Sequence, residues 1–141
     1  MVHKLEVTID VIIHATEDIS KFSESFEEIF DLKDDFTIQQ TVGHFENPIT
    51  ILNIKIEKSQ AQKFVEKLME TLSKDQINKL VEEIEERTVD SRIHIRFDKQ
   101  EFIKGNLTFR EKDAIKVKIH TPIYNKKDTV KIFSEIFQVA N

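Results

Sequence analysis

The sequence predicts an α+β domain in two layers, with helices packed on one face of a mostly antiparallel sheet. Two observations lead to this fold class. Several short runs alternate apolar and polar residues, as half-buried strands do, and the runs between them repeat apolar residues at helical spacing. The 141 residues suit one domain over 1–141, since a chain of this length buries roughly two-thirds of its unfolded surface.

The first half of the chain supplies a strand, a helix and two further strands. Apolar residues alternate from Leu5 to Ile13, and similar runs cover 36–42 and 49–57. Thr16 is the expected N-cap of the helix, because Glu17 and Asp18 follow it in the first turn. The apolar face of that helix consists of Ile19, Phe22, Phe26, Ile29 and Phe30.

Two helices are expected next, and a capping box marks the start of each one. The boxes are Ser59 with Gln62 and Ser73 with Gln76. The second helix carries an acidic run on its outer face, which we interpret as a solvated surface and not as a metal site. That run consists of Glu82, Glu83, Glu85 and Glu86.

The last third of the chain contains three alternating runs and a final helix. The runs cover 92–100, 106–110 and 114–120, and they predict a meander of three strands. After Pro122, either Asn125 or Asp128 can cap the last helix.

Charge is distributed unevenly along the chain. Residues 1–91 carry 10 Lys and Arg against 20 Asp and Glu, whereas residues 92–118 carry 8 against 4. The whole chain has a net charge of −5, so the basic segment is a local feature of an acidic protein. Such asymmetry indicates a surface that meets a polyanion, without saying which one.

If the three late strands pair in sequence, their outward positions become neighbours. Basic side chains spaced in this way suit phosphate contacts, which need charge more than fixed geometry. The alternative is an ordinary solvated sheet face whose cations pair with Glu6 and Asp10. No aromatic pair points outward in this register, so base stacking is not predicted. The phosphate contacts expected are Arg92, Arg96, Lys99, Arg110, Lys116 and Lys118.

Several other classes of function find no support in the residues. The chain has no Cys, and its five histidines lack metal-ligand spacing, so no metal and no cofactor is expected. There is no phosphate-binding glycine loop or nucleophile elbow, so we expect a protein that is not an enzyme. No apolar run approaches the roughly 20 residues that span a bilayer, so we expect no membrane partner and a cytoplasmic location.

Three separated motifs carry a resemblance to a known family. They are His14-Ala-Thr-Glu-Asp18, Gly43-His-Phe-Glu-Asn-Pro-Ile49, and Arg96-Phe-Asp-Lys-Gln100 followed by Gly105. In this order they resemble the archaeal RNA-binding-domain proteins once described as predicted exosome subunits. The resemblance implies a small α+β fold similar to the large-subunit ribosomal protein that holds 5S rRNA. Phe45-Glu46 and Glu101-Phe102-Ile103 depart from the family pattern.

The three motifs stand where predicted strands end, so we expect them to meet at one edge of the sheet. Loop residues on a rigid scaffold often bind ligands, although turn and cap roles explain the same residue types. We expect Lys99→Ala to weaken RNA binding with little loss of stability, and Asp98→Ala to lower the melting temperature. The residues expected at this edge are His14, His44, Asn47, Asp98, Lys99 and Gln100.

The leading hypothesis is therefore a protein that binds structured RNA through its backbone and shape, associated with RNA processing or ribosome assembly. The alternative is a protein-interaction subunit, in which the basic surface meets an acidic partner or a second copy of the chain.

Overall fold

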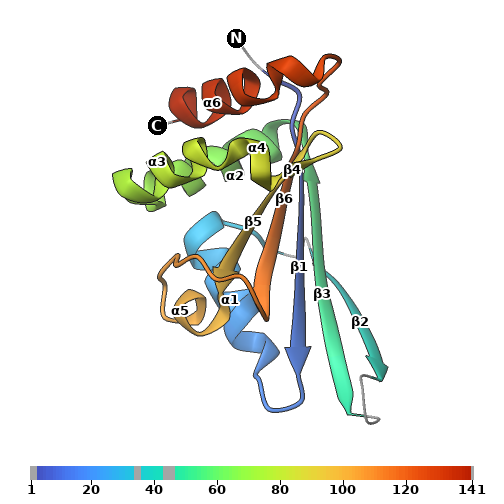
Figure 1. Cartoon of the computed structure of the whole chain (residues 1–141). Helices are drawn as coiled ribbons and strands as arrows, with labels where there is room; N and C mark the ends of the chain where they lie inside the picture. The colour runs from blue at the N-terminus through green and yellow to red at the C-terminus, as the bar shows by residue number, and fades with distance from the viewer. Residues whose placement is uncertain (1–2, 34–35, 43–46, 141) are drawn as a thin grey trace. The chain divides into compact units, whose positions relative to one another are not determined.

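The computed structural model describes residues 3–33, 36–42 and 47–140. Its strands form one sheet in the order β2-β3-β1-β6-β5-β4 (Figure 1). Strands β2 and β3 pair antiparallel, as do β4 and β5. The predicted α+β class with a mostly antiparallel sheet is confirmed. The strands are β1 Glu6–His14, β2 Phe36–Val42, β3 Pro48–Glu57, β4 Thr88–Val89, β5 Arg92–Asp98 and β6 Ala114–His120.

Alternation along the strands decides which side chains enter the core. On β1 the odd-numbered residues from Val7 to Ile13 are buried, whereas Glu6, Ile12 and His14 are exposed. Strands β5 and β6 follow the same rule, with Ile93, Ile95, Phe97, Ile115, Val117 and Ile119 buried. One side of these strands is therefore apolar and covered, and the other carries the polar and basic residues.

The chain divides into two compact units, and β1, β3, β5 and β6 each contribute residues to both. Unit 1 comprises Met1–Val7, Ile56–Ile95 and Lys118–Asn141, and unit 2 comprises Thr8–Lys55 and Arg96–Val117.

Unit 2 contains helices α1 (Ile19–Phe30) and α5 (Lys99–Ile103), which pack through aromatic rings. The ring centroids of Phe26 and Phe102 are 4.6 Å apart, and those of Phe30 and Phe102 are 6.4 Å apart. A third pair, Phe97 and Phe109, is stacked at 5.6 Å. Burial of these rings supplies much of the apolar driving force for this unit.

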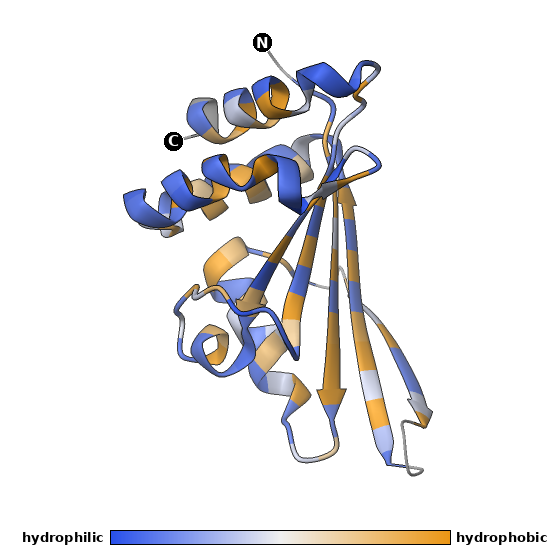
Figure 2. Cartoon of the chain, in the orientation of Figure 1, coloured by the Kyte–Doolittle hydropathy of each residue, from blue (hydrophilic) through white to orange (hydrophobic). Residues whose placement is uncertain are grey.

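In unit 1 the last helix, α6 (Thr129–Ala140), packs against three others, and their apolar stripes face inward (Figure 2). Its Phe133 and Phe137 are both buried. The 3-10 turn η2 (Lys126–Asp128) leads into α6. The three partner helices are α2 (Lys58–Thr71), α3 (Lys74–Glu82) and α4 (Ile84–Arg87).

The predicted strand over 106–110 is wrong. After Asp98 the chain turns into α5, and Gly105 leaves that helix with a φ of +92°. Only an isolated bridge joins Phe97 and Phe109, so β6 pairs directly with β5. Leu107 is buried and Phe109 stacks on Phe97 without a strand ladder, which explains their strand-like alternation.

Two of the predicted helix starts are also wrong. Asp18, not Thr16, caps α1, because its carboxylate accepts a hydrogen bond from the Ser20 backbone N–H at 2.9 Å. Helix α2 begins at Lys58 without a side-chain cap, and Gln62 donates to the His3 carbonyl instead. The second capping box, Ser73 with Gln76, is confirmed.

Within the described residues, no helix is long and apolar enough to cross a membrane.

Candidate functional site

Lys99 lies at the centre of a charged cluster in unit 2. Its Nζ donates to the backbone carbonyl of Ile12, to Glu17 Oε1 at 3.1 Å and to Asp113 Oδ1 at 3.0 Å. The side chain is only 3% exposed. An ammonium group has three N–H donors, and three acceptors meet them here. The expectation of an exposed Lys99 that meets phosphate is therefore wrong, because its charge is buried and paired.

His14 joins the same cluster from the end of β1. Its Nε2 lies 3.1 Å from Asp113 Oδ1, and its backbone N–H donates to Glu17 Oε1 at 2.9 Å. Burial raises the pKa of Asp113, but hydrogen bonds from Lys99 and His14 outweigh that effect, so the pKa is lowered. Asp113 thus stays ionised and ties the end of β1 to the segment before β6.

Asp98, at the end of β5, contacts both the start of α5 and Arg110 in the segment before β6. Its carboxylate accepts the Glu101 backbone N–H at 2.9 Å, which caps α5, and it accepts Arg110 Nη1 at 3.1 Å. The pKa of Asp98 is lowered, first by the backbone hydrogen bond from Glu101 and also by Arg110. We call His14, Glu17, Asp98, Lys99, Arg110 and Asp113 the strand-end cluster.

All members of the strand-end cluster except His14 line a hollow of about 100 Å³, together with Gln100. This volume is well below the roughly 300 Å³ typical of small-molecule sites. Three carboxylates face two permanent cations there, so the potential does not favour an anion. The cluster therefore fixes the geometry of the strand ends, and its hollow is poorly suited to hold an anion, although the Arg110 side chain is itself exposed to solvent.

The predicted meeting of the first and third motifs is confirmed, whereas residues 43–46 of the second motif lie outside the described residues. Lys99 and His14 share Asp113 Oδ1, so the third motif does meet the first. Ala15 lines a shallow depression of about 360 Å³ together with the hairpin residues Gln40–Val42 and Pro48–Thr50. Asn47 is exposed just before β3, and His44 lies outside the described residues.

The cations on the polar side of the strands are placed differently. In unit 2, Lys116 is exposed on β6, and Arg96 on β5 lies 3.6 Å from Glu111. Lys116 makes no hydrogen bond or ion pair with the described residues. Unit 1 carries the exposed Arg92 and the half-buried Lys118 on the same two strands. Of the two acidic residues expected to pair with these cations, Glu6 lies 4.0 Å from His120, and Asp10 accepts a hydrogen bond from Asn53.

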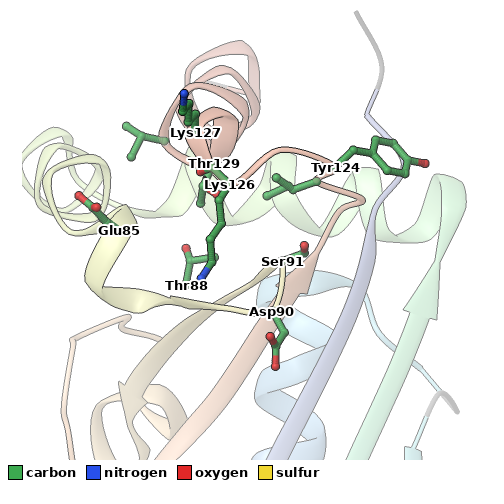
Figure 3. A pocket seen from close by; sticks show the side chains of 10 residues that line it. Glu85, Thr88, Asp90, Ser91, Tyr124, Lys126, Lys127 and Thr129 are labelled. Carbon is green, nitrogen blue, oxygen red and sulfur yellow. Dashed lines mark hydrogen bonds between the residues drawn. The ribbon is translucent and has the colours of Figure 1, made fainter.

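Sequence reasoning missed a second feature, a pocket in unit 1 beside the start of α6 (Figure 3). Tyr124 stands at this pocket and is 97% exposed. The signal was visible in the sequence: Tyr124 is the only tyrosine, and it precedes Asn125, Lys126 and Lys127. An alternating pattern cannot reveal it, because it lies in a loop between elements.

No group of three His, Asp or Glu side chains that could hold a metal ion occurs in the part of the chain that the structure describes.

A sheet with one covered side and basic residues on the other defines a small α+β module of the kind that meets an anionic partner. The model of the RNA-binding family matches residues 6–121, and the chain belongs to that family. The residues matched include both the strand-end cluster and the strand cations.

The relatives of this chain are archaeal proteins. It is 36% identical to RNA-binding protein PAB1135 of Pyrococcus abyssi over 129 residues, covering 86% of this chain and 84% of that one. It is 33% identical to uncharacterized protein MJ0213 of Methanocaldococcus jannaschii, covering 89% and 91%. Among solved structures, protein AF2318 of Archaeoglobus fulgidus has a TM-score of 0.82 at 26% identity, covering 94% of this chain and 99% of that chain.

Proposed function

We propose that this protein binds structured RNA through the phosphate backbone and takes no part in catalysis. The observation that carries the proposal is the basic polar side of β5 and β6, where Arg92 and Lys116 are exposed, in a protein whose net charge is −5. Membership of an RNA-binding family supports it. The phosphate contacts are Arg96, Arg110 and Lys116 in unit 2, and Arg92 and Lys118 in unit 1.

Charge explains why these positions matter. A chain with 26 acidic residues repels a polyanion at most of its surface, so binding needs a local concentration of cations. Side chains on alternate positions of neighbouring strands offer such a concentration without hydrogen-bond geometry specific to any base. The proposed recognition is therefore of backbone and shape, which suits a double-helical RNA element.

Arg110 has a double role in this proposal. It donates to Asp98 and to the Lys112 carbonyl, which orients its guanidinium. A guanidinium has five N–H donors, so two such bonds leave others for a phosphate. Lys99 has no donor to spare, and its contribution is to hold the strand ends in place.

We also propose a cellular setting for this function, in RNA processing or ribosome assembly in the cytoplasm. In such a setting a module that contacts the RNA backbone would hold or position the RNA. Capture of RNA from cell extract by ultraviolet crosslinking, with and without nuclease treatment, tests this placement.

The direct test compares three double variants by fluorescence anisotropy of a labelled RNA hairpin. Arg96→Gln/Lys116→Gln and Arg92→Gln/Lys118→Gln remove strand cations from one unit each, so the contribution of each unit is measured separately. Lys63→Gln/Lys74→Gln removes two exposed lysines of α2 and α3 and is the matched control. We expect the strand variants to bind every hairpin sequence more weakly, and the control to bind like the wild type. Equal affinities for all four proteins would contradict the proposed contacts.

Self-association is a second candidate, which one observation favours. On the edge strand β2, Ile38 and Val42 are 55% and 63% exposed. Exposed apolar side chains on an edge strand favour pairing of that strand with another chain. Light scattering at low and high salt tests it: a monomer at both salts removes this candidate, and a dimer lost in Ile38→Lys supports it.

A further inference from the structure

The pocket beside the start of α6 has the size and the polar groups of a ligand site. Its volume is about 720 Å³, within the range of roughly 300–1,000 Å³ common for ligand pockets. The pocket belongs to unit 1, and its residues around Tyr124 lie beyond the stretch that the family model matches. It is lined by Glu85, Thr88, Asp90, Ser91, Ile123, Tyr124, Lys126, Lys127, Thr129 and Val130.

Tyr124 is unusual because a tyrosine normally buries most of its ring and leaves only the hydroxyl in water. Here the side chain projects from the rim of the pocket into solvent (Figure 3). The turn that presents it is held by local hydrogen bonds. The Asn125 side chain accepts from the Lys127 backbone N–H at 3.1 Å, and the Thr129 hydroxyl donates to the Lys126 carbonyl at 2.9 Å. These bonds order the turn that follows Tyr124, and the exposed ring is open to stacking by a planar group from solution.

The charged side chains that line the pocket do not pair with one another. Lys126 extends toward Thr88, whereas Lys127 points up over α6 and Asp90 points down from the β4–β5 turn (Figure 3). Among the described residues, the side chains of Lys126, Lys127, Glu85 and Asp90 make no hydrogen bond or ion pair. Two lysines and two acidic residues therefore line one pocket without pairing with each other.

We propose that this pocket binds unpaired ribonucleotides of an RNA strand. One base stacks on Tyr124, and the sugar and phosphate of its neighbour enter the pocket. Lys126 and Lys127 bind the phosphate, and a carboxylate accepts from the ribose hydroxyls, which distinguish RNA from DNA. The inference deepens the proposed RNA-binding function and rests on it, but it concerns single-stranded RNA and a different set of residues.

The first test places a fluorescent side chain at position 124, where the tyrosine ring is proposed to stack on a base. The chain contains no Trp, so Tyr124→Trp introduces one indole, which is excited where nucleobases absorb little. The probes are a blunt RNA hairpin, the same hairpin with a short unpaired tail, the tail alone as RNA, the tail alone as DNA, and free adenosine monophosphate. We expect the RNA tail to quench the indole emission, alone or attached, and the blunt hairpin to leave it unchanged.

The second test measures affinity. Tyr124→Ala is expected to weaken binding of the tailed hairpin by roughly 5- to 150-fold, the effect of losing one base–aromatic stack, and to leave the blunt hairpin unaffected. Tyr124→Phe should bind like the wild type. Lys126→Ala/Lys127→Ala should also weaken only the tailed probe, against Lys63→Ala/Lys74→Ala as the control. Unchanged melting temperatures are expected for Tyr124 variants, because the side chain is exposed.

The outcomes separate this inference from the proposed function. If the blunt hairpin binds but the tail adds no affinity and no quenching, the inference is overturned and the proposed function stands. Quenching by the RNA tail without binding of the blunt hairpin supports the inference and contradicts the strand-cation proposal. If adenosine monophosphate binds as tightly as the tail, the pocket is a free-nucleotide site and the inference is overturned.

Discussion

Lys99 illustrates how a basic residue in a basic segment can serve the fold and not the ligand. Lys99 is the first residue of α5. Its side chain reaches back to the end of β1 and the turn after it, where the Ile12 carbonyl and the Glu17 carboxylate accept hydrogen bonds from its Nζ. Burying an ammonium group is costly unless it is paired, and Asp113 completes the pairing. The sequence could not show this, because its three acceptors are 14 to 87 positions away along the chain.

Lys99→Met tests this role. The substitution keeps the length of the side chain but leaves Glu17 and Asp113 without their shared cation, so we expect a loss of about 2–4 kcal/mol in the free energy of unfolding. Urea denaturation measures it. Lys112→Met is the control, since Lys112 is exposed, and should change stability by less than about 0.5 kcal/mol. Equal stability of the two variants would mean that the buried pairing contributes nothing.

Asp113 predicts a pH dependence. Its pKa is lowered in the folded state, so its contribution to stability is complete above the ordinary carboxyl value of about 4 and is lost as pH falls below that value through the lowered pKa. Asp113→Asn should therefore be less stable than the wild type at neutral pH and lose less stability between neutral and acidic pH. Glu66→Gln, on an exposed face of α2, should follow the wild type. Parallel curves for wild type and Asp113→Asn would contradict the assignment.

At the scale of elements, long periodic segments were predictable and short ones were not. The alternation in β1, β3, β5 and β6 and the helical spacing in α1, α2, α3 and α6 each span several residues, so the pattern identifies them. Helix α5 has only five residues, which is too few for a period, and its start depends on one capping side chain, Asp98. The hairpin β4–β5 turns through Asp90 and Ser91, whose positive φ values no apolar pattern indicates.

Asp98→Ala should lower the melting temperature, as the sequence suggested, and the structure supplies the reason. The variant loses the cap of α5 and the pairing with Arg110, together about 1–2 kcal/mol. Asp98→Asn keeps an oxygen that can accept the Glu101 N–H, so it should lose less. Thermal unfolding followed by circular dichroism compares the three proteins. A melting temperature for Asp98→Ala at or above that of the wild type would show that the cap is unimportant.

At the scale of the whole molecule, the charge count along the sequence indicated a polyanion partner but could not separate structural cations from free ones. Of the cations predicted to contact RNA, Lys99 is buried and Arg110 is paired with Asp98, whereas Lys116 is exposed. The basic segment that the charge count identified, residues 92–118, ends before Tyr124, Lys126 and Lys127, so the count did not point to these residues. Whether a cation is buried or paired depends on tertiary contacts, which a sequence pattern does not contain.

The salt dependence of RNA binding tests the central proposal most directly. The slope of log affinity against log salt reports how many phosphate contacts release counterions, and each lost contact should reduce it by about one unit. We predict that Arg96→Gln/Lys116→Gln lowers the slope for a blunt RNA hairpin by about two units, while Lys63→Gln/Lys74→Gln leaves it unchanged. A double variant whose slope and affinity both equal those of the wild type would contradict the assignment of these strands as the RNA-binding surface.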